Sequence, residues 1–252
     1  MKKCHNITAF LLAVTLVNSM ANVRAENNFD VKNIGELKSI ASAELNGKVL
    51  FNSLLKQKPL YGIGMANGLN AEVLILADKP YVSGFREMAY QYPLTNNPEI
   101  SFLAYSYVDK WQSINLPLEV NNFQKLEAYL PVIANKMGLD TTKPFPFLIS
   151  AEASYLQWFV VNGMGNLQPN PLSSFVRGRY LGGLNDVKIE GLGFYSTKYQ
   201  GIFTTPGNNM HIHFKTMSSL ENGMTNNQTF IGHLDNSIQL KSGAVIQLPA
   251  NQ

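Results

Sequence analysis

The pattern of hydrophobic and polar positions predicts two helical regions in a chain that is otherwise built from strands. Residues 31–56 carry apolar side chains at helical spacing between Ile34 and Ala41, which predicts a short helical hairpin or a helix followed by a strand. Residues 120–138 show the same spacing over a longer stretch, with Asn121 and Asn122 as N-capping residues at the start and a glycine at the end. We therefore expect one well-defined helix near the middle of the chain.

The remaining apolar runs are short, rich in β-branched and aromatic side chains, and separated by turn residues, which is typical of strands. After a loop rich in Gly, Asn and Pro at residues 162–171, the spacing of the runs predicts a small barrel or sandwich. The expected fold class is α+β and strand-dominated, with an N-terminal mixed β-sheet with helices and a C-terminal small β-barrel or sheet. The expected strands are residues 73–76, 79–82, 100–111, 147–150, 155–161, 187–189, 192–195, 201–204, 210–214, 230–234, 238–240 and 244–248.

The first 25 residues have the pattern of a signal peptide. Lys2 and Lys3 precede an apolar run, and the small-x-small sequence Val23-Arg24-Ala25 is typical of a cleavage site. We expect residues 1–25 to be removed, 26–165 to form an N-terminal α+β domain and 166–252 a C-terminal β domain. The protein is then exported, to the periplasm or out of the cell, without membrane attachment after cleavage. A retained anchor is the alternative, although the apolar run is far shorter than the roughly 20 residues that span a bilayer.

Composition and charge exclude several classes of protein. The 252 residues are 45% hydrophobic and 15% charged, which excludes a disordered or fibrous chain. Removing Lys2, Lys3 and Arg24 from the 20 basic residues leaves 17 against 17 acidic ones, so charge gives no case for a nucleic-acid partner. The single cysteine, Cys4, falls within the signal segment. Thiolate catalysis and Cys-ligated metal are therefore excluded from the mature chain.

The histidines carry the sharpest chemical signal. Apart from His5, all of them fall within 23 residues, at His211, His213 and His233. In a strand, side chains two residues apart point to the same side, so His211 and His213 could bind one ion, and His233 in a neighbouring strand could complete the set. Three nitrogen ligands with one open position are typical of a catalytic zinc site, although imidazole also suits Cu, Fe or Ni. Ordinary histidines of a β-domain are the alternative.

Two groups of motifs resemble the acetolactate decarboxylase family, over the chain from about residue 34 to its end. In the C-terminal part these are the segment 191–201, Pro206-Gly207, His211-Ile-His213-Phe214 and Gly232-His233-Leu-Asp235, which resemble the family's zinc-binding H-x-H-F and G-G-H-V-L-D. In the N-terminal part, residues 62–75 resemble the family's G-x-G-T-F-x-x-L-D-G-E-M-I.

The resemblance implies a metal-dependent decarboxylation of 2-acetolactate to acetoin and CO₂. His211, His213 and His233 would hold Zn²⁺ or another divalent metal, which acts as a Lewis acid on an enediolate intermediate, without an organic cofactor. Glu72 would be the catalytic residue that handles a proton or orients the substrate hydroxyl, and Gln247 aligns with a late glutamate of the family as a substrate-binding residue. The partner would be a small 2-hydroxy-3-oxo acid, and the resemblance also implies a homodimer.

The chain departs from the family pattern at several positions. Met65 stands where the family has Thr, and the stretch 155–162 lacks the family's arginine, so that this role is either lost or taken by Arg177 or Arg179. Residues 218–228 form a polar insertion between the second and third histidines.

Three other interpretations of the sequence stay open. The first is an exported metal-binding homologue with altered or lost activity. The second is a cupin-like metalloenzyme, which fits less well because the first acid after His213 is Glu221. The third is a secreted β-rich interaction domain without a metal.

Overall fold

The computed structural model describes most of the chain downstream of the expected signal peptide. The predicted signal peptide, the loop at 162–171 and the insertion at 218–228 lie outside the described residues. The described residues are 27–40, 46–55, 59–69, 71–83, 97–161, 179–217 and 229–250.

The N-terminal part of the chain forms a six-stranded sheet. Its strand order is β1-β6-β3-β4-β5, and β2 pairs with the remaining part of the β6 edge. In the described residues every strand pair of this sheet is antiparallel, whereas we expected a mixed sheet. The elements are β1 (Lys32–Ile34), α1 (Leu37–Ile40), β2 (Val49–Leu50), η1 (Phe51–Leu54), β3 (Leu60–Ala66), η2 (Asn67–Leu69), β4 (Glu72–Leu76), β5 (Lys79–Val82) and β6 (Glu99–Tyr107).

The second sheet is also antiparallel and contains a closed ring of strands. Its order is β11-β10-β9-β8-β12-β7, and β11 also pairs with β8, so β8 to β11 form a small barrel. This confirms the expected C-terminal barrel or sheet. Its strands are β7 (Trp111–Asn115), β8 (Phe145–Val161), β9 (Arg179–Tyr195), β10 (Met210–Thr216), β11 (Ile231–Leu240) and β12 (Val245–Pro249).

This second sheet takes strands from both sides of the segment in which we placed the domain boundary. β7 and β8 precede residues 162–171, and β9 to β12 follow them. The division of the chain between residues 165 and 166 itself lies outside the described residues and stays a prediction.

The central helix forms where the sequence predicts it. α2 runs from Phe123 to Lys136, and the side chain of its N-cap, Asn122, accepts a hydrogen bond from the Lys125 N–H. After the C-cap, Gly138 has a φ of +84°, a conformation that glycine adopts without steric cost. The buried side of α2 packs against β11. Among the described residues no helix is both long and apolar enough to cross a bilayer.

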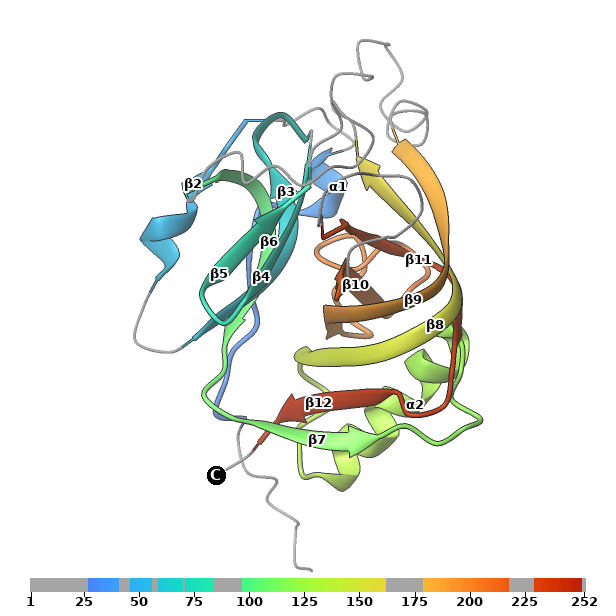
Figure 1. Ribbon diagram of the computed structural model, residues 1–252. Coiled ribbons are helices and arrows are strands. Elements are labelled where there is room, and N and C mark those ends of the chain that lie inside the picture. The colour runs from blue at the N-terminus through green and yellow to red at the C-terminus, as the bar shows by residue number, and fades with distance from the viewer. Residues whose placement is uncertain are drawn as a thin grey trace, which may run out of the picture.

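One hydrophobic core joins the two sheets. It contains side chains of the first sheet, among them Ile63, Leu74 and Phe102, together with barrel residues such as Phe159 and Leu192. β4 lies against β10 and β11, and Figure 1 shows these strands facing one another between the two sheets. The side of the barrel that faces the first sheet is therefore buried, and side chains of the first sheet contact it.

Gly64 of β3 is required for close packing of two strands in the first sheet. A Cβ built on Gly64 would lie 2.0 Å from the Phe102 carbonyl oxygen and 2.9 Å from the Leu103 Cα, both of them backbone atoms. We expect Gly64→Ala to lower the free energy of unfolding by at least about 2–3 kcal/mol, because the strands must move apart. Urea unfolding measures the effect.

Gly62→Ala is the matched control on the same strand. Its new Cβ would be 3.1 Å from Leu103 Cδ1, a movable methyl group, and 3.3 Å from the Ala104 carbonyl oxygen. The loss should be clearly smaller than that of Gly64→Ala, and equal losses would contradict the proposed cause.

Candidate metal centre

Strand register brings the three histidines together. His211 and His213 are two residues apart on β10, and His213 lies directly opposite His233 on β11. Paired residues of neighbouring strands place their side chains on the same face of a sheet. All three rings therefore lie on one face of the barrel, the face that packs on the first sheet.

The ring nitrogens converge closely. His211 Nε2 lies 2.9 Å from His213 Nε2 and 3.0 Å from His233 Nδ1. On the far side of each ring, His211 Nδ1 lies 2.6 Å from the Phe203 carbonyl oxygen and His213 Nδ1 lies 2.9 Å from the Val73 carbonyl oxygen. Since a carbonyl only accepts, both Nδ1 atoms carry the proton, and both Nε2 atoms present lone pairs.

Burial keeps these rings neutral. It lowers the pKa of His211 to about 4, with the Phe203 carbonyl acting weakly in the opposite direction. Burial also lowers the pKa of His213 and of His233 well below the usual value, and the neighbouring histidines lower it further. Protonation therefore does not relieve the contact between the nitrogen lone pairs near neutral pH.

A divalent cation fits this donor set. Between the neutral rings of His211 and His213 there is no proton to share, so the 2.9 Å contact is repulsive unless a cation accepts both lone pairs. Zinc–nitrogen bonds of about 2.0–2.1 Å separate tetrahedral ligand atoms by about 3.3 Å, so the nitrogens need to part by only a few tenths of an ångström. The two Nδ1–H···O=C bonds are the outer contacts that typically orient metal-binding imidazoles. His211, His213 and His233 could thus hold one metal ion.

Glu72 is the acidic group that lies at this centre. It is the first residue of β4 and is fully buried, with Oε1 accepting a hydrogen bond from the Val161 N–H at 2.9 Å. Its other oxygen, Oε2, lies 3.5 Å from His213 Nε2 and has no hydrogen-bond partner among the described residues. Burial raises the pKa of Glu72 to about 8, although the Val161 N–H and the charge of Arg179 lower it. The carboxyl group is therefore able to hold a proton near neutral pH.

The first sheet also supplies an apolar wall to the centre. On β3, Met65 pairs with Glu72 on one side and with Phe102 of β6 on the other, so these three side chains share a face. The Phe102 ring stacks on His211 with a centroid distance of 6.3 Å. Met65, which replaces the family's Thr, is thus a buried apolar neighbour of Glu72 and offers no hydrogen-bond donor.

The structure places Arg179 beside the histidine cluster and Gln247 away from it. Arg179 lies at the centre's edge, where its guanidinium carbon is 4.7 Å from the centre of the Phe159 ring, whereas Arg177 falls outside the described residues. The structure does not bring Gln247 to the histidines. One row of paired residues runs from His213 through Leu192 and Leu148 to Gln247, so three strand spacings of about 4.8 Å each separate Gln247 from His213. Instead, Gln247 Nε2 donates to Ser113 Oγ at 2.9 Å.

Phe159 is a residue of the site that the sequence did not single out. Its ring stacks on His233 at a centroid distance of 4.0 Å and lies beside Arg179. In the sequence it was one of several aromatics in an expected strand, and nothing distinguished it from core residues. Only the pairing of Phe159 with His233 shows that its ring packs against a candidate metal ligand.

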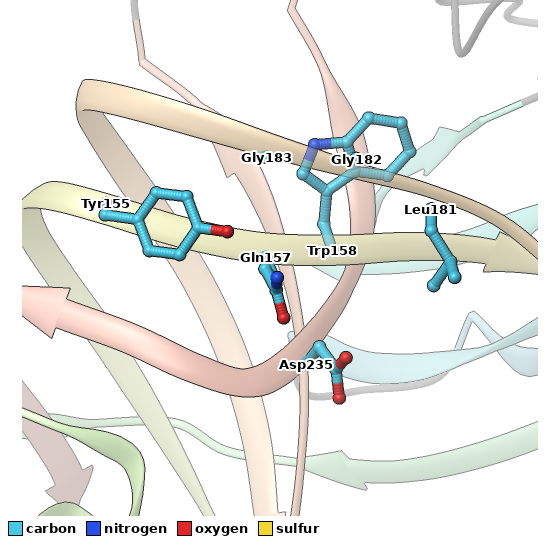
Figure 2. Close-up of a pocket in the computed structure, with 7 residues that line it drawn as sticks. All are labelled: Tyr155, Gln157, Trp158, Leu181, Gly182, Gly183 and Asp235. Carbon is cyan, nitrogen blue, oxygen red and sulfur yellow. The ribbon is translucent and has the colours of Figure 1, made fainter.

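A small pocket of about 210 Å³ lies on the strands β8, β9 and β11. Gln157 precedes Phe159 by two positions on β8, Leu181 follows Arg179 by two on β9, and Asp235 follows His233 by two on β11. Figure 2 shows these three side chains pointing to one side, with Trp158 on the other. The pocket thus extends along the same strands, one step beyond the histidines, and is also lined by Tyr155, Trp158, Gly182 and Gly183.

Comparison with known proteins supports the fold that the sequence motifs indicated. The chain matches no protein-family model and no curated protein sequence. Among solved structures it is similar to a Staphylococcus aureus protein of unknown function described as similar to α-acetolactate decarboxylase, with a TM-score of 0.64 and 16% identity over 88% of this chain and 86% of that chain. It is equally similar to α-acetolactate decarboxylase from Bacillus subtilis strain 168, with a TM-score of 0.63 and 17% identity over 88% and 86% of the two chains. The chain therefore has the fold of the acetolactate decarboxylases, with a buried cluster of three histidines at its centre.

Proposed function

We propose that this protein is a metal-dependent lyase that decarboxylates 2-acetolactate to acetoin and CO₂. His211, His213 and His233 hold the metal, for which zinc is the first candidate. The observation that carries the proposal is the convergence of three buried ring nitrogens, two of which, His211 Nε2 and His213 Nε2, are unprotonated and lie 2.9 Å apart. The similarity in fold to a Bacillus subtilis acetolactate decarboxylase supports the choice of reaction.

The reaction requires an electron sink and a proton. A divalent cation bound by the imidazoles supplies the Lewis acid that stabilises negative charge on the substrate's oxygens when CO₂ leaves. The carbon that loses CO₂ must then receive one proton. Glu72 carries this proton on Oε2, the oxygen without a hydrogen-bond partner among the described residues, while Val161 fixes the other oxygen. Burial raises the pKa of Glu72 to about 8 in the metal-free protein, whereas a cation bound by the histidines would favour the carboxylate, so this group can hold a proton and give it up.

The surrounding residues exclude water from this chemistry. Phe102, Met65 and Phe159 cover the histidines and Glu72, and each of them is nearly inaccessible to solvent. A low local dielectric strengthens the interaction between the substrate's developing charge and the groups that face it.

The location of the reaction is part of the proposal. The sequence of residues 1–25 supports export to the periplasm or out of the cell. The substrate would then be a 2-hydroxy-3-oxo acid available in that compartment, and the product a neutral ketone.

Activity on racemic acetolactate tests the function directly. We expect the purified protein, stripped of metal and reloaded with one equivalent of zinc, to release equal amounts of CO₂ and acetoin. The metal-free protein is the blank, and both products are measured in the same sample. Zinc-loaded protein that binds the ion but releases no CO₂ above this blank would contradict the decarboxylase assignment.

A metal-binding homologue without this activity is the second candidate, and the position of Gln247 favours it. The family resemblance predicted Gln247 as a substrate-binding residue. In the structure its side chain donates a hydrogen bond to Ser113, far from the histidines. If substrate binding requires a side chain there, the protein would bind zinc and leave acetolactate intact. The same assay therefore separates the two candidates.

A further inference from the structure

The pocket on β8, β9 and β11 has no part in the reaction proposed above. Neither the three histidines nor Glu72 line it. Its volume of about 210 Å³ is below the roughly 300–1,000 Å³ of pockets for drug-sized ligands, so it admits a ligand no larger than one ring with its substituents.

Two consecutive glycines of β9 open the pocket. A Cβ on Gly182 would lie 2.4 Å from Trp158 Cζ2, and a Cβ on Gly183 would lie 3.1 Å from Tyr155 Cε2. The Tyr155 ring therefore lies over a strand without side chains, and 37% of this residue stays exposed. Leu181, 61% exposed, is on the same side of β9 as Gly183. The pocket thus offers a ligand an aromatic and an aliphatic surface.

An irregularity of β11 directs an acidic side chain to the same place. The pairing of β11 with β8 shifts register between Leu234 and Ile238, and Asp235 follows Leu234 directly. Bulges re-aim side chains and are frequent beside functional sites. The Asp235 carboxylate is also oriented, because its Oδ1 accepts a hydrogen bond from the Asn236 N–H at 2.8 Å.

Three polar groups of the pocket are available to a ligand. Within the described part of the chain, the Tyr155 hydroxyl, the Gln157 amide and the Oδ2 atom of Asp235 make no hydrogen bond. Figure 2 shows the Tyr155 hydroxyl pointing toward Gln157, and the Gln157 amide lying next to Asp235. The hydroxyl and the amide can each donate and accept, whereas the carboxylate oxygen only accepts.

The charge of the pocket disfavours anions. Asp235 is its one charged side chain among the residues that the structure describes, so an anion such as the substrate proposed above would meet a like charge without a compensating cation. An ammonium group would match Asp235, but it only donates and would leave the donors of Gln157 without an acceptor. A neutral ligand with several hydroxyl groups satisfies all three polar groups, since each hydroxyl both donates and accepts.

We propose that this pocket binds one unit of a neutral sugar. Hydroxyl groups of the sugar bond to Asp235 and Gln157, and the apolar face of its ring lies on Tyr155. The size of the pocket, its apolar surfaces and its mixture of donors and acceptors all match such a ligand. Sugar binding is independent of the histidines and goes beyond the proposed decarboxylation.

Three methyl glycosides of nearly the same shape test the proposal in ligand-detected NMR titrations. Methyl β-D-glucoside is neutral, its glucuronide is an anion, and its 2-amino-2-deoxy counterpart is a cation. The methyl glycosides of mannose, galactose and N-acetylglucosamine extend the neutral series. We expect a neutral glycoside to bind with a dissociation constant on the order of 1 mM, as is usual for so small a ligand. It should bind about 10-fold more tightly than the anion and the cation, and equally to metal-free and zinc-loaded protein.

Gln157→Ala should weaken binding of the neutral glycoside by roughly 3–10-fold, because it removes hydrogen bonds from the wall of the pocket. Gln157 is exposed, so this variant should fold normally. Gln112→Ala is the matched control: it removes an exposed glutamine from β7, at the far edge of the second sheet, and should leave the affinity unchanged. Asp235→Asn keeps the shape of the side chain and removes its charge, so it should reduce the discrimination against the glucuronide.

Four results would overturn the proposal. These are no saturable binding of any neutral glycoside, equal or tighter binding of the anion or the cation, an affinity of Gln157→Ala equal to that of Gln112→Ala, and binding that requires zinc. The last result would assign the sugar to the histidines. All these titrations are made without acetolactate, so they leave the proposed decarboxylation to its own assay.

Discussion

Replacing His211 and His213 together by alanine is expected to abolish stoichiometric zinc binding and acetoin formation. The two side chains supply two of the three nitrogens, and the lone pairs that face each other at 2.9 Å are both lost. Loss of an outer contact to a metal ligand already costs about 10–100-fold in affinity, so loss of two ligands should cost more than 100-fold. Metal content after dialysis, measured by elemental analysis, and titration with a zinc-sensitive dye both report the effect.

His233→Ala is the second variant, and it protects the test against misfolding. His233 has 8% of its surface exposed, so its removal disturbs packing less than removal of the two fully buried rings. It should also lose zinc, while the circular dichroism spectrum stays that of the wild type. A folded His233→Ala protein that keeps one tightly bound zinc would contradict the three-histidine site.

The pH dependence of zinc binding follows from the lowered histidine pKa values. An imidazole with the usual pKa near 6.5 competes with zinc for a proton below that pH. Burial lowers the pKa of His211 to about 4, so in Glu72→Gln, whose side chain no longer titrates beside the histidines, zinc affinity should stay nearly constant between pH 8 and pH 6 in a dye titration. In the metal-free protein the lowered pKa values also make stability depend on pH. Below pH 6.5 the unfolded chain binds protons that the folded chain does not, so these histidines lower the free energy of unfolding as the pH drops from 6.5 toward 4.

The metal centre could be predicted from the sequence because strand geometry is simple. Two histidines at positions i and i+2 of a strand share a face, and the third lay in the next β-run of the expected set. The structure confirms this arrangement, with His213 and His233 in direct register. The insertion between them has no influence on the prediction, since only the pairing of the flanking strands matters.

The long hairpin of β8 and β9 could not be predicted, and with it the position of Arg179. The sequence 182–186, Gly-Gly-Leu-Asn-Asp, has the composition of a turn, but it lies inside β9. The reason is packing: a Cβ on Gly182 would lie 2.4 Å from Trp158 Cζ2, so the missing side chain makes room for the indole on the neighbouring strand. Once β9 is seen to begin at Arg179, its register with Val161 follows.

Glu72 shows where motif and tertiary structure each contribute. The motif resemblance singled it out, but only the packing of β4 on β10 and β11 explains its chemistry. A carboxyl at the start of a strand is normally solvated, and here the barrel buries it completely. Gln247 illustrates the converse, since alignment with a family glutamate could not reveal that its strand lies at the far side of the second sheet.

Glu72→Gln is expected to lower kcat for acetoin formation by about 10²–10⁴-fold, the usual contribution of a general acid or base. The amide has nearly the same shape, its oxygen still accepts from the Val161 N–H, and the three histidines still bind zinc. What disappears is the ionisable carboxyl group, whose Oε2 lies 3.5 Å from His213 Nε2. Steady-state kinetics with metal analysis of the same preparation separate a loss of proton transfer from a loss of zinc.

The same substitution should stabilise the metal-free protein at alkaline pH, which distinguishes a functional carboxyl from a structural one. The pKa of Glu72 is raised by burial from 4.5 to about 8, so the folded state binds a proton that the unfolded state releases. Wild type therefore loses stability as the pH rises from 4.5 to 8, whereas the variant, whose amide does not titrate, keeps its stability over this range. Urea unfolding at pH 8.5 should show Glu72→Gln more stable by roughly 2–5 kcal/mol, and at pH 4.5 the difference should nearly vanish. Lower stability at pH 8.5 would mean that Glu72 is a structural anion, and it would remove the proton donor on which the proposed reaction depends.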